Sequence, residues 1–72
     1  MITEIGITAG EIWKMLDEHG TLEIESVLQK VSMGRELGFM AIGWLCRESH
    51  VVMKQENDKR YLELKKIEEG LP

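Results

Sequence analysis

A long apolar stretch near the middle of the chain, from Gly34 to Val52, constrains the fold more than any other feature of the sequence. Within it, apolar residues from Leu37 to Leu45 recur at intervals of three and four, which is the spacing of one face of a helix. Few polar side chains interrupt the rest of the circumference, and a helix that is apolar nearly all round is packed on more than one side. We therefore predict one continuous central helix from Leu37 to Glu48, covered by the segments before and after it.

Two amphipathic helices are predicted before the central one. In the first, apolar residues recur at helical spacing from Ile5 to Leu16, and Gly20 follows where a left-handed residue commonly ends a helix. Thr3 is one candidate for its N-terminal cap, and a later start at Thr8 is the alternative. The second helix is expected to run roughly from residue 23 to residue 30.

Gly6 and Gly10 lie inside the first predicted helix, where each costs about 1 kcal/mol relative to alanine. We interpret them as positions where another backbone, that of the central helix, approaches closely. Ser32, in the turn that precedes the central helix, is the candidate cap for that helix.

The spacing of apolar residues changes after the central helix. His50 to Gln55 is a β-branched strand, residues 56–59 form a turn rich in Asn and Asp, and Arg60 to Leu64 is the returning strand. Residues 65–72 form a short charged tail that either adds half a helical turn or frays. Three helices followed by a two-stranded hairpin predict an α+β fold, a winged helix-turn-helix, with residues 1–72 as a single domain.

Two motifs also carry a resemblance to a known family. They are Ile5-Gly6-x-x-Ala9-Gly10-x-Ile12-Trp13-x-x-Leu16, closed by Gly20, and Ala41-Ile42-Gly43-Trp44-Leu45-Cys46-Arg47-Glu48. With them the sequence resembles the small stand-alone winged helix-turn-helix proteins of bacteria and archaea whose cellular role is unassigned. The resemblance covers about residues 4–64 and implies the fold but no activity. The family pattern has a basic residue two positions after the glutamate, where this chain has His50.

The size and charge of the chain exclude several classes of protein. Its 72 residues, 43% hydrophobic and 31% charged, suit one small globular domain, and no run approaches the eighteen apolar residues that span a membrane. The N-terminus lacks the pattern of a secretory signal, and the single cysteine, Cys46, indicates a reducing compartment, the cytoplasm. The net charge of −4 argues against a surface that is basic throughout, because affinity for phosphate comes from clustered Lys and Arg.

Double-stranded DNA is the first candidate partner. The second helix of a helix-turn-helix presents its N-terminal residues to base edges, and Arg, Lys, Asn and Gln are the usual readers. The candidate DNA contacts are Arg35 and Arg47 on the central helix and Lys54, Lys59 and Arg60 on the wing. The alternative is that these charges only solvate the hairpin, since Glu56 and Asp58 interrupt them.

A second copy of the chain, or another protein, is the second candidate partner. The apolar residues of the central helix exceed what a core of this size can hold beside those of the first helix, and Trp and Phe are favoured interface anchors. The candidate interface residues are Phe39, Ile42 and Trp44. The alternative is that the hairpin and the N-terminal segment cover them.

Catalysis and metal binding are not indicated by the sequence. It offers no nucleophile beside a base and no glycine-rich phosphate loop, since the glycines lie inside helices. Cys46 has no cysteine partner and no ligand spacing with His19 or His50, so we interpret it as a small buried hydrophobic residue.

We therefore predict a cytoplasmic regulatory or adaptor protein, not an enzyme, with no cofactor, metal or small-molecule substrate. Binding of DNA in transcription regulation is the first hypothesis. The alternative is a protein-interaction or homodimerisation module on the same fold that does not bind DNA.

Overall fold

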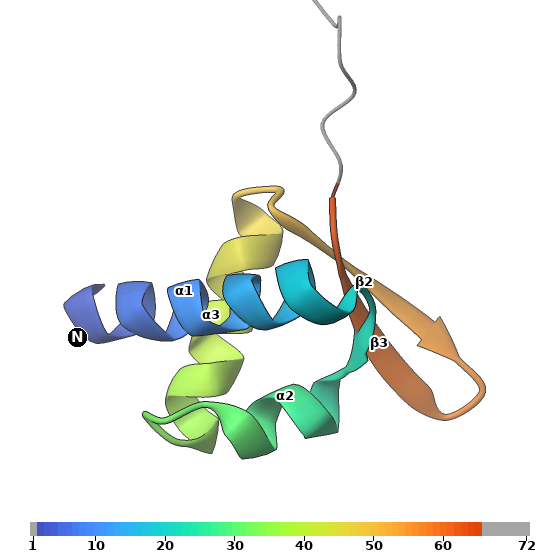
Figure 1. Cartoon of the computed structure of the whole chain (residues 1–72), viewed down its shortest axis with the longest axis horizontal. Helices are drawn as coiled ribbons and strands as arrows, with labels where there is room; N and C mark the ends of the chain where they lie inside the picture. Colours follow the sequence, from blue (N-terminus) through green and yellow to red (C-terminus); the bar gives the residue numbers. More distant parts are fainter. Residues whose placement is uncertain (1, 66–72) are drawn as a thin grey trace, which may run out of the picture.

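The computed structural model describes residues 2–65, which form three helices and a three-stranded antiparallel sheet (Figure 1). The elements follow in the order α1 (Ile2–His19), β1 (Leu22–Glu23), α2 (Ile24–Lys30), α3 (Arg35–Arg47), β2 (Val51–Glu56) and β3 (Lys59–Leu64). The predicted winged helix-turn-helix architecture is confirmed. All but the first residue of the predicted tail, 65–72, lies outside the described residues.

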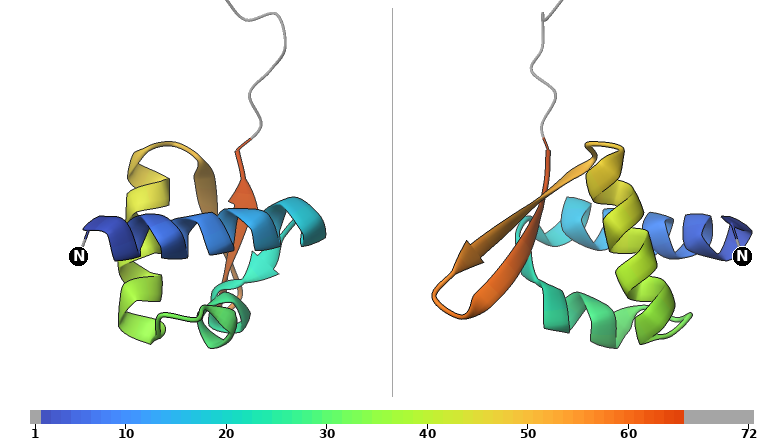
Figure 2. Two further views of the ribbon diagram at one scale, coloured as in Figure 1. Left: turned by 60° about the vertical axis from the view of Figure 1, so that its left-hand side comes forward. Right: turned by 180° about the vertical axis from the view of Figure 1, so that it is seen from behind.

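The three helices form a compact group from which the hairpin projects. In Figure 1, α3 crosses behind α1, and α2 lies below α1; the right-hand view of Figure 2 shows α3 in front, with the hairpin beside it. The hairpin of β2 and β3 therefore stands on the side of the molecule away from the start of α1, in the position of a wing.

The sheet contains one strand more than the sequence predicts. Its order is β1-β3-β2, and Leu22 of β1 is paired with Leu62 of β3, which is also paired with Met53 of β2. The expectation of a two-stranded wing misses β1 because two residues are too short to show an alternating pattern, and their pairing depends on tertiary packing. The hairpin turn is as predicted, with Asn57 at a φ of 56°.

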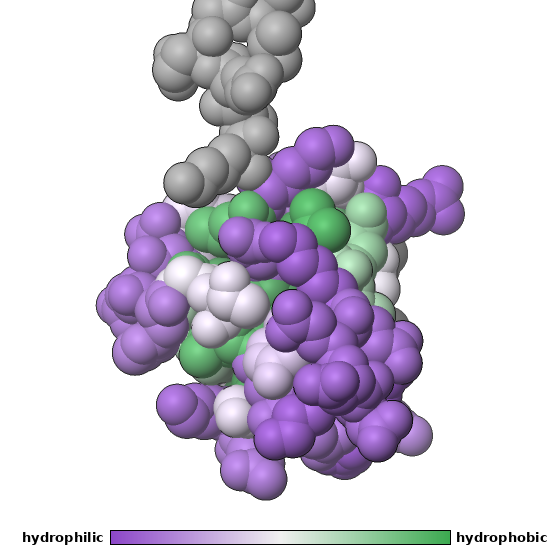
Figure 3. Space-filling view, turned by 90° about the vertical axis from the view of Figure 1, so that its right-hand side faces the viewer, coloured by the Kyte–Doolittle hydropathy of each residue, from purple (hydrophilic) through white to green (hydrophobic). Residues whose placement is uncertain are grey.

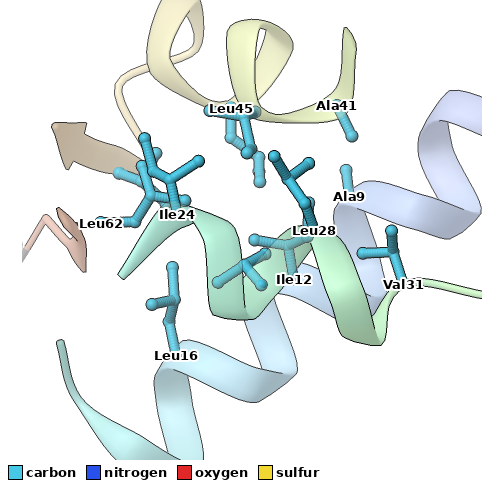
Figure 4. Packing of buried hydrophobic residues seen from close by; sticks show 12 residues of the cluster. Ala9, Ile12, Leu16, Ile24, Leu28, Val31, Ala41, Leu45 and Leu62 are labelled. Carbon is cyan, nitrogen blue, oxygen red and sulfur yellow. The ribbon is translucent and has the colours of Figure 1, made fainter. Parts of the chain in front are cut away.

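One hydrophobic core connects the helices to the wing. Figure 4 shows side chains from α1 (Ile12, Leu16), α2 (Leu28), α3 (Leu45) and β3 (Leu62) pointing toward one another. All of them are buried. Because Leu62 of β3 and Val51 of β2 both belong to this core, the wing is fixed to the helices.

Two helices begin at residues other than those predicted. Helix α1 is already helical at Ile2, so neither a cap at Thr3 nor a start at Thr8 is correct. Helix α2 begins at residue 24, one residue later than expected. The end of α1 is as predicted, since Gly20 has a φ of 83° and its N–H donates to the Leu16 carbonyl.

Ser32 does not cap α3. The N-cap residue is Gly34, with a φ of 97° and no side-chain cap. Instead, the Ser32 backbone N–H and Oγ–H donate to the Glu11 carboxylate, at 3.2 and 2.6 Å. These two hydrogen bonds connect α1 to the turn between α2 and α3. The two donors of Ser32 are thus bonded to a carboxylate of α1.

The glycines of α1 do not serve the close approach that the sequence suggests. A Cβ atom at Gly6 or Gly10 would meet nothing within 4 Å, so the prediction of close approach by α3 is wrong. Close approach occurs instead at Gly38 of α3, where a Cβ would lie 2.7 Å from Leu28 Cδ2 and 3.2 Å from Val31 Cγ2. Gly38 therefore allows α3 to pack against α2.

The two glycines of α3 should respond in opposite ways to alanine. Gly43→Ala gains helix propensity in open space and should stabilise the fold by up to about 1 kcal/mol. Gly38→Ala gains the same propensity but overpacks the α2–α3 contact, so it should be less stable than Gly43→Ala by about 1–3 kcal/mol. Urea unfolding of both variants measures the difference, and equal stability would contradict the packing described at Gly38.

Candidate functional site

Helix α3 leaves one side open to solvent. Its buried residues are Gly38, Ala41, Ile42 and Leu45. Its opposite, exposed arc consists of Glu36, Met40, Gly43 and Arg47. The expectation that α3 is packed on more than one side is confirmed, because α3 contacts α1, α2 and β2, while the described residues leave this arc uncovered. The arc holds one side chain able to read base edges, Arg47, and one acidic side chain that repels phosphate.

Arg35 is held in place at the first turn of α3. Its Nη1 and Nη2 groups donate to the two carboxylate oxygens of Glu25 on α2, at 2.9 and 3.0 Å. Its guanidinium carbon also lies 5.2 Å from the centre of the Phe39 ring. A carboxylate and an aromatic face thus fix the orientation of this arginine, although both partners of the ion pair are about half exposed.

A second arginine acts on the same carboxylate from the wing. The hydrogen bond from Arg35 is the main reason that the pKa of Glu25 lies below its ordinary value of 4.5, and the positive charges of Arg35 and of Arg60 on β3 lower that pKa further. The Glu25 carboxylate of α2 is therefore paired with Arg35 of α3 and is also acted on by the charge of Arg60 of β3. This group, which we call the Arg35–Glu25–Arg60 cluster, carries one net positive charge.

The remaining wing cations face acidic neighbours. Lys54 Nζ lies 2.6 Å from Glu63 Oε1, and this hydrogen bond raises the pKa of Lys54. Lys59 stands opposite Glu56 in the hairpin register. Figure 3, which views the molecule from the side of the wing, shows a largely hydrophilic face with a smaller hydrophobic group. The wing is thus polar but close to electrically neutral.

Of the five candidate DNA contacts, two act on the same carboxylate. Arg35 is bonded to Glu25 and the charge of Arg60 also lowers the pKa of Glu25, whereas Arg47 lies in the last turn of α3, at the other end of the helix. Lys54 belongs to an ion pair within the wing. The sequence did not indicate Glu25, because the partner of Arg35 lies on a different helix, ten residues away along the chain.

A separate apolar hollow lies between α1 and the end of α3. Its volume is about 270 Å³, and its lining consists of Gly6, Ala9, Gly10, Trp13, Trp44, Leu45 and His50. Trp13 and Trp44 remain 44% and 46% exposed. The rings of Trp44 and His50 lie 6.1 Å apart at 33°. We call this surface the tryptophan hollow.

The structure places the three candidate interface residues in different environments. Trp44 lines the tryptophan hollow, and Phe39 is exposed on the side of α3 that carries Arg35. Ile42 is 2% exposed and belongs to the core, so it is not accessible on the surface of a single copy. Trp13, which was not among the candidate interface residues, is the exposed aromatic residue that the prediction missed. Its position at the edge of the apolar stripe, beside Gly6 and Gly10, was the available signal.

Other chemistry has little support in residues 2–65. Cys46 is half-buried beside the core, and burial raises the pKa of its thiol, which lowers its reactivity. Within these residues no group of three or more His, Cys, Asp or Glu side chains is placed to hold a metal ion. None of the helices in this part of the chain is long and apolar enough to cross a membrane.

Known proteins of the same architecture match most of the chain. Residues 1–64 match the family model described as Winged helix-turn-helix domain (DUF2582). The uncharacterized protein MJ1608 of Methanocaldococcus jannaschii is 36% identical over 64 residues, which cover 86% of this chain and 91% of the relative. The solution NMR structure of protein BT2368 from Bacteroides thetaiotaomicron has a TM-score of 0.74 at 31% identity, covering 86% of this chain and 76% of that one.

The ion pair at Glu25 makes a prediction about acid titration. Because the folded pKa of Glu25 is lowered, the stabilising effect of the pair is complete above the ordinary value of 4.5 and disappears as the pH falls through the folded pKa. Arg35→Ala should raise the titration midpoint of the Glu25 carboxyl, measured by NMR. Arg47→Ala is the matched control and should leave it unchanged; an equal midpoint in wild type and Arg35→Ala would disprove the assignment.

Proposed function

The chain belongs to the winged helix-turn-helix family that its residues 1–64 match, and on this premise we propose that it binds duplex DNA as a regulatory protein of the cytoplasm. The proposed mechanism is non-covalent recognition without catalysis. The Arg35–Glu25–Arg60 cluster is the proposed centre of contact, with Lys59 and Arg47 as peripheral contacts.

The observation that carries this proposal is the orientation of Arg35, at the N-terminal end of α3, by the Glu25 carboxylate and the Phe39 ring. In helix-turn-helix proteins this end of the second motif helix is directed toward DNA. Nη1 and Nη2 of Arg35 each donate one hydrogen bond to the Glu25 carboxylate. A guanidinium has five N–H donors, so the other donors of Arg35 remain for a phosphate oxygen. The carboxylate therefore orients Arg35 without using all of its hydrogen-bond donors.

The same geometry limits what kind of binding is expected. The exposed arc of α3 has little with which to read bases, so most of the affinity would come from phosphates and depend little on sequence. With two or three phosphates contacted by one copy, affinity should fall about 10- to 40-fold between roughly 50 and 200 mM salt. Binding by a single copy is therefore expected to be weak and sensitive to salt.

Fluorescence anisotropy of a labelled duplex at several salt concentrations tests the proposal. Arg60→Gln and Arg35→Gln should each weaken binding and reduce the salt slope by about one, because each removes about one phosphate contact. Glu25→Gln should strengthen binding, because it removes the negative charge between the two arginines.

Lys14→Gln provides the matched control. Lys14 lies on the exposed side of α1, beside Met15 and Glu18, and its replacement changes the net charge by the same amount. It should leave the affinity close to that of the wild type. Absence of salt-dependent binding at low salt, or an equal loss in Lys14→Gln and Arg60→Gln, would overturn the proposed contact surface.

A second candidate function, protein interaction or homodimerisation without DNA, is favoured by a different observation. Trp13 and Trp44 expose nearly half of their surfaces on one face of α1 and α3. If the chain self-associates and shows no salt-dependent affinity for duplex DNA, this second function replaces the first.

A further inference from the structure

We propose that the tryptophan hollow is the contact surface between two copies of this chain, arranged about a two-fold axis that runs across α1. This inference is independent of DNA binding. It assigns the exposed aromatic residues of α1 and α3 to a homodimer and identifies Trp13, with Gly6 and Gly10, as its centre.

The glycines of α1 are the first support for this arrangement. Gly6 and Gly10 each cost about 1 kcal/mol relative to alanine in a helix, and a Cβ at either position would meet nothing within 4 Å. No contact among the described residues therefore accounts for them. A surface without side chains allows a second helix to approach closely, and a dimer would make that approach.

The surface is also self-complementary. Gly6 and Gly10 lie one turn apart on α1, and Trp13 projects from the next turn of the same face. In a two-fold interface the same patch occurs on both sides, so a projection on one copy must meet a recess on the other. Two antiparallel α1 helices that cross near Gly10 would place each Trp13 over the glycine recess of the partner.

The centre of this face is uncharged, and Asp17 lies at its edge, one turn beyond Trp13 on α1. The chain has a net charge of −4, so two copies repel each other, and the repulsion is weakest where no carboxylate faces the partner. The residues that line the tryptophan hollow include no Asp, Glu, Lys or Arg. Aromatic residues in such an uncharged centre are the usual anchors of a protein interface.

The available area indicates a weak dimer. A fully covered aromatic side chain buries about 150–250 Å², so the exposed parts of Trp13 and Trp44 together supply roughly 200 Å². A standard interface needs about 800 Å² from each partner. The tryptophans supply about a quarter, and the remainder must come from the length of α1, including Ile7. We therefore expect reversible association that depends on concentration.

Analytical ultracentrifugation of the full chain from about 1 µM to about 1 mM measures this association. The wild type should pass from monomer to dimer within that range. Gly10→Gln fills the recess and should weaken association at least tenfold. The same variant should unfold at a higher urea concentration when dilute, because glutamine is a better helix former and the position is open.

Gly43→Gln is the matched control, since it makes the same change at another open helical glycine that is not part of the tryptophan hollow. It should keep the association constant of the wild type. The proposal is overturned if the wild type stays monomeric throughout, in which case a different protein would cover the hollow. It is also overturned if Gly43→Gln and Gly10→Gln weaken association equally.

Discussion

The burial of Leu62 between the sheet and the helices is the contact on which the rest of the structure depends. This residue is fully buried, it is paired with Leu22 on one side and Met53 on the other, and its side chain enters the core formed by the three helices. Together with Val51 of β2 and Leu64 of β3, which also pack in or against the core, this residue holds the wing to the bundle. It also fixes β3 relative to α2, and this determines how close Arg60 comes to Glu25.

The fold then presents two surfaces with different chemistry. The α2–α3–wing surface is charged but nearly balanced, since Glu25 and Glu63 each pair with a basic residue. The α1–α3 surface is uncharged and aromatic. In the proposed account, the first surface would contact phosphate and the second would contact another copy of the chain, so neither contact would occupy the residues of the other. A protein with a net charge of −4 would then contact DNA through a few oriented arginines and not through a basic surface.

The sequence predicts most of the fold, because local signals determine most of it. Helical spacing of apolar residues gave the three helices, Gly20 and Asn57 marked a helix end and a hairpin turn, and alternation gave β2 and β3. Strand β1 could not be predicted, since it exists only through its pairing with β3. The role of Ser32 was missed for the same reason, because its partner, Glu11, lies 21 residues away along the chain.

The candidate site was less predictable than the fold. The sequence identifies Arg35 and Arg60 as basic residues. It does not identify Glu25 as the carboxylate on which both charges act, because that depends on the fold. The spacing of apolar residues along a helix does not show which of its two sides a neighbouring element covers. Ile42 was therefore predicted at an interface although it is buried, and Trp13 was omitted from that interface although it is exposed.

The claim that the two surfaces work separately is tested most directly by one NMR series on the labelled full chain, first diluted and then titrated with duplex DNA. Dilution should shift the signals of Gly10 and of the Trp13 and Trp44 indoles, whereas DNA should shift those of Arg35 and Arg60. If both steps moved the same set of signals, or if dilution moved those of the exposed arc of α3, the account of two surfaces would be wrong.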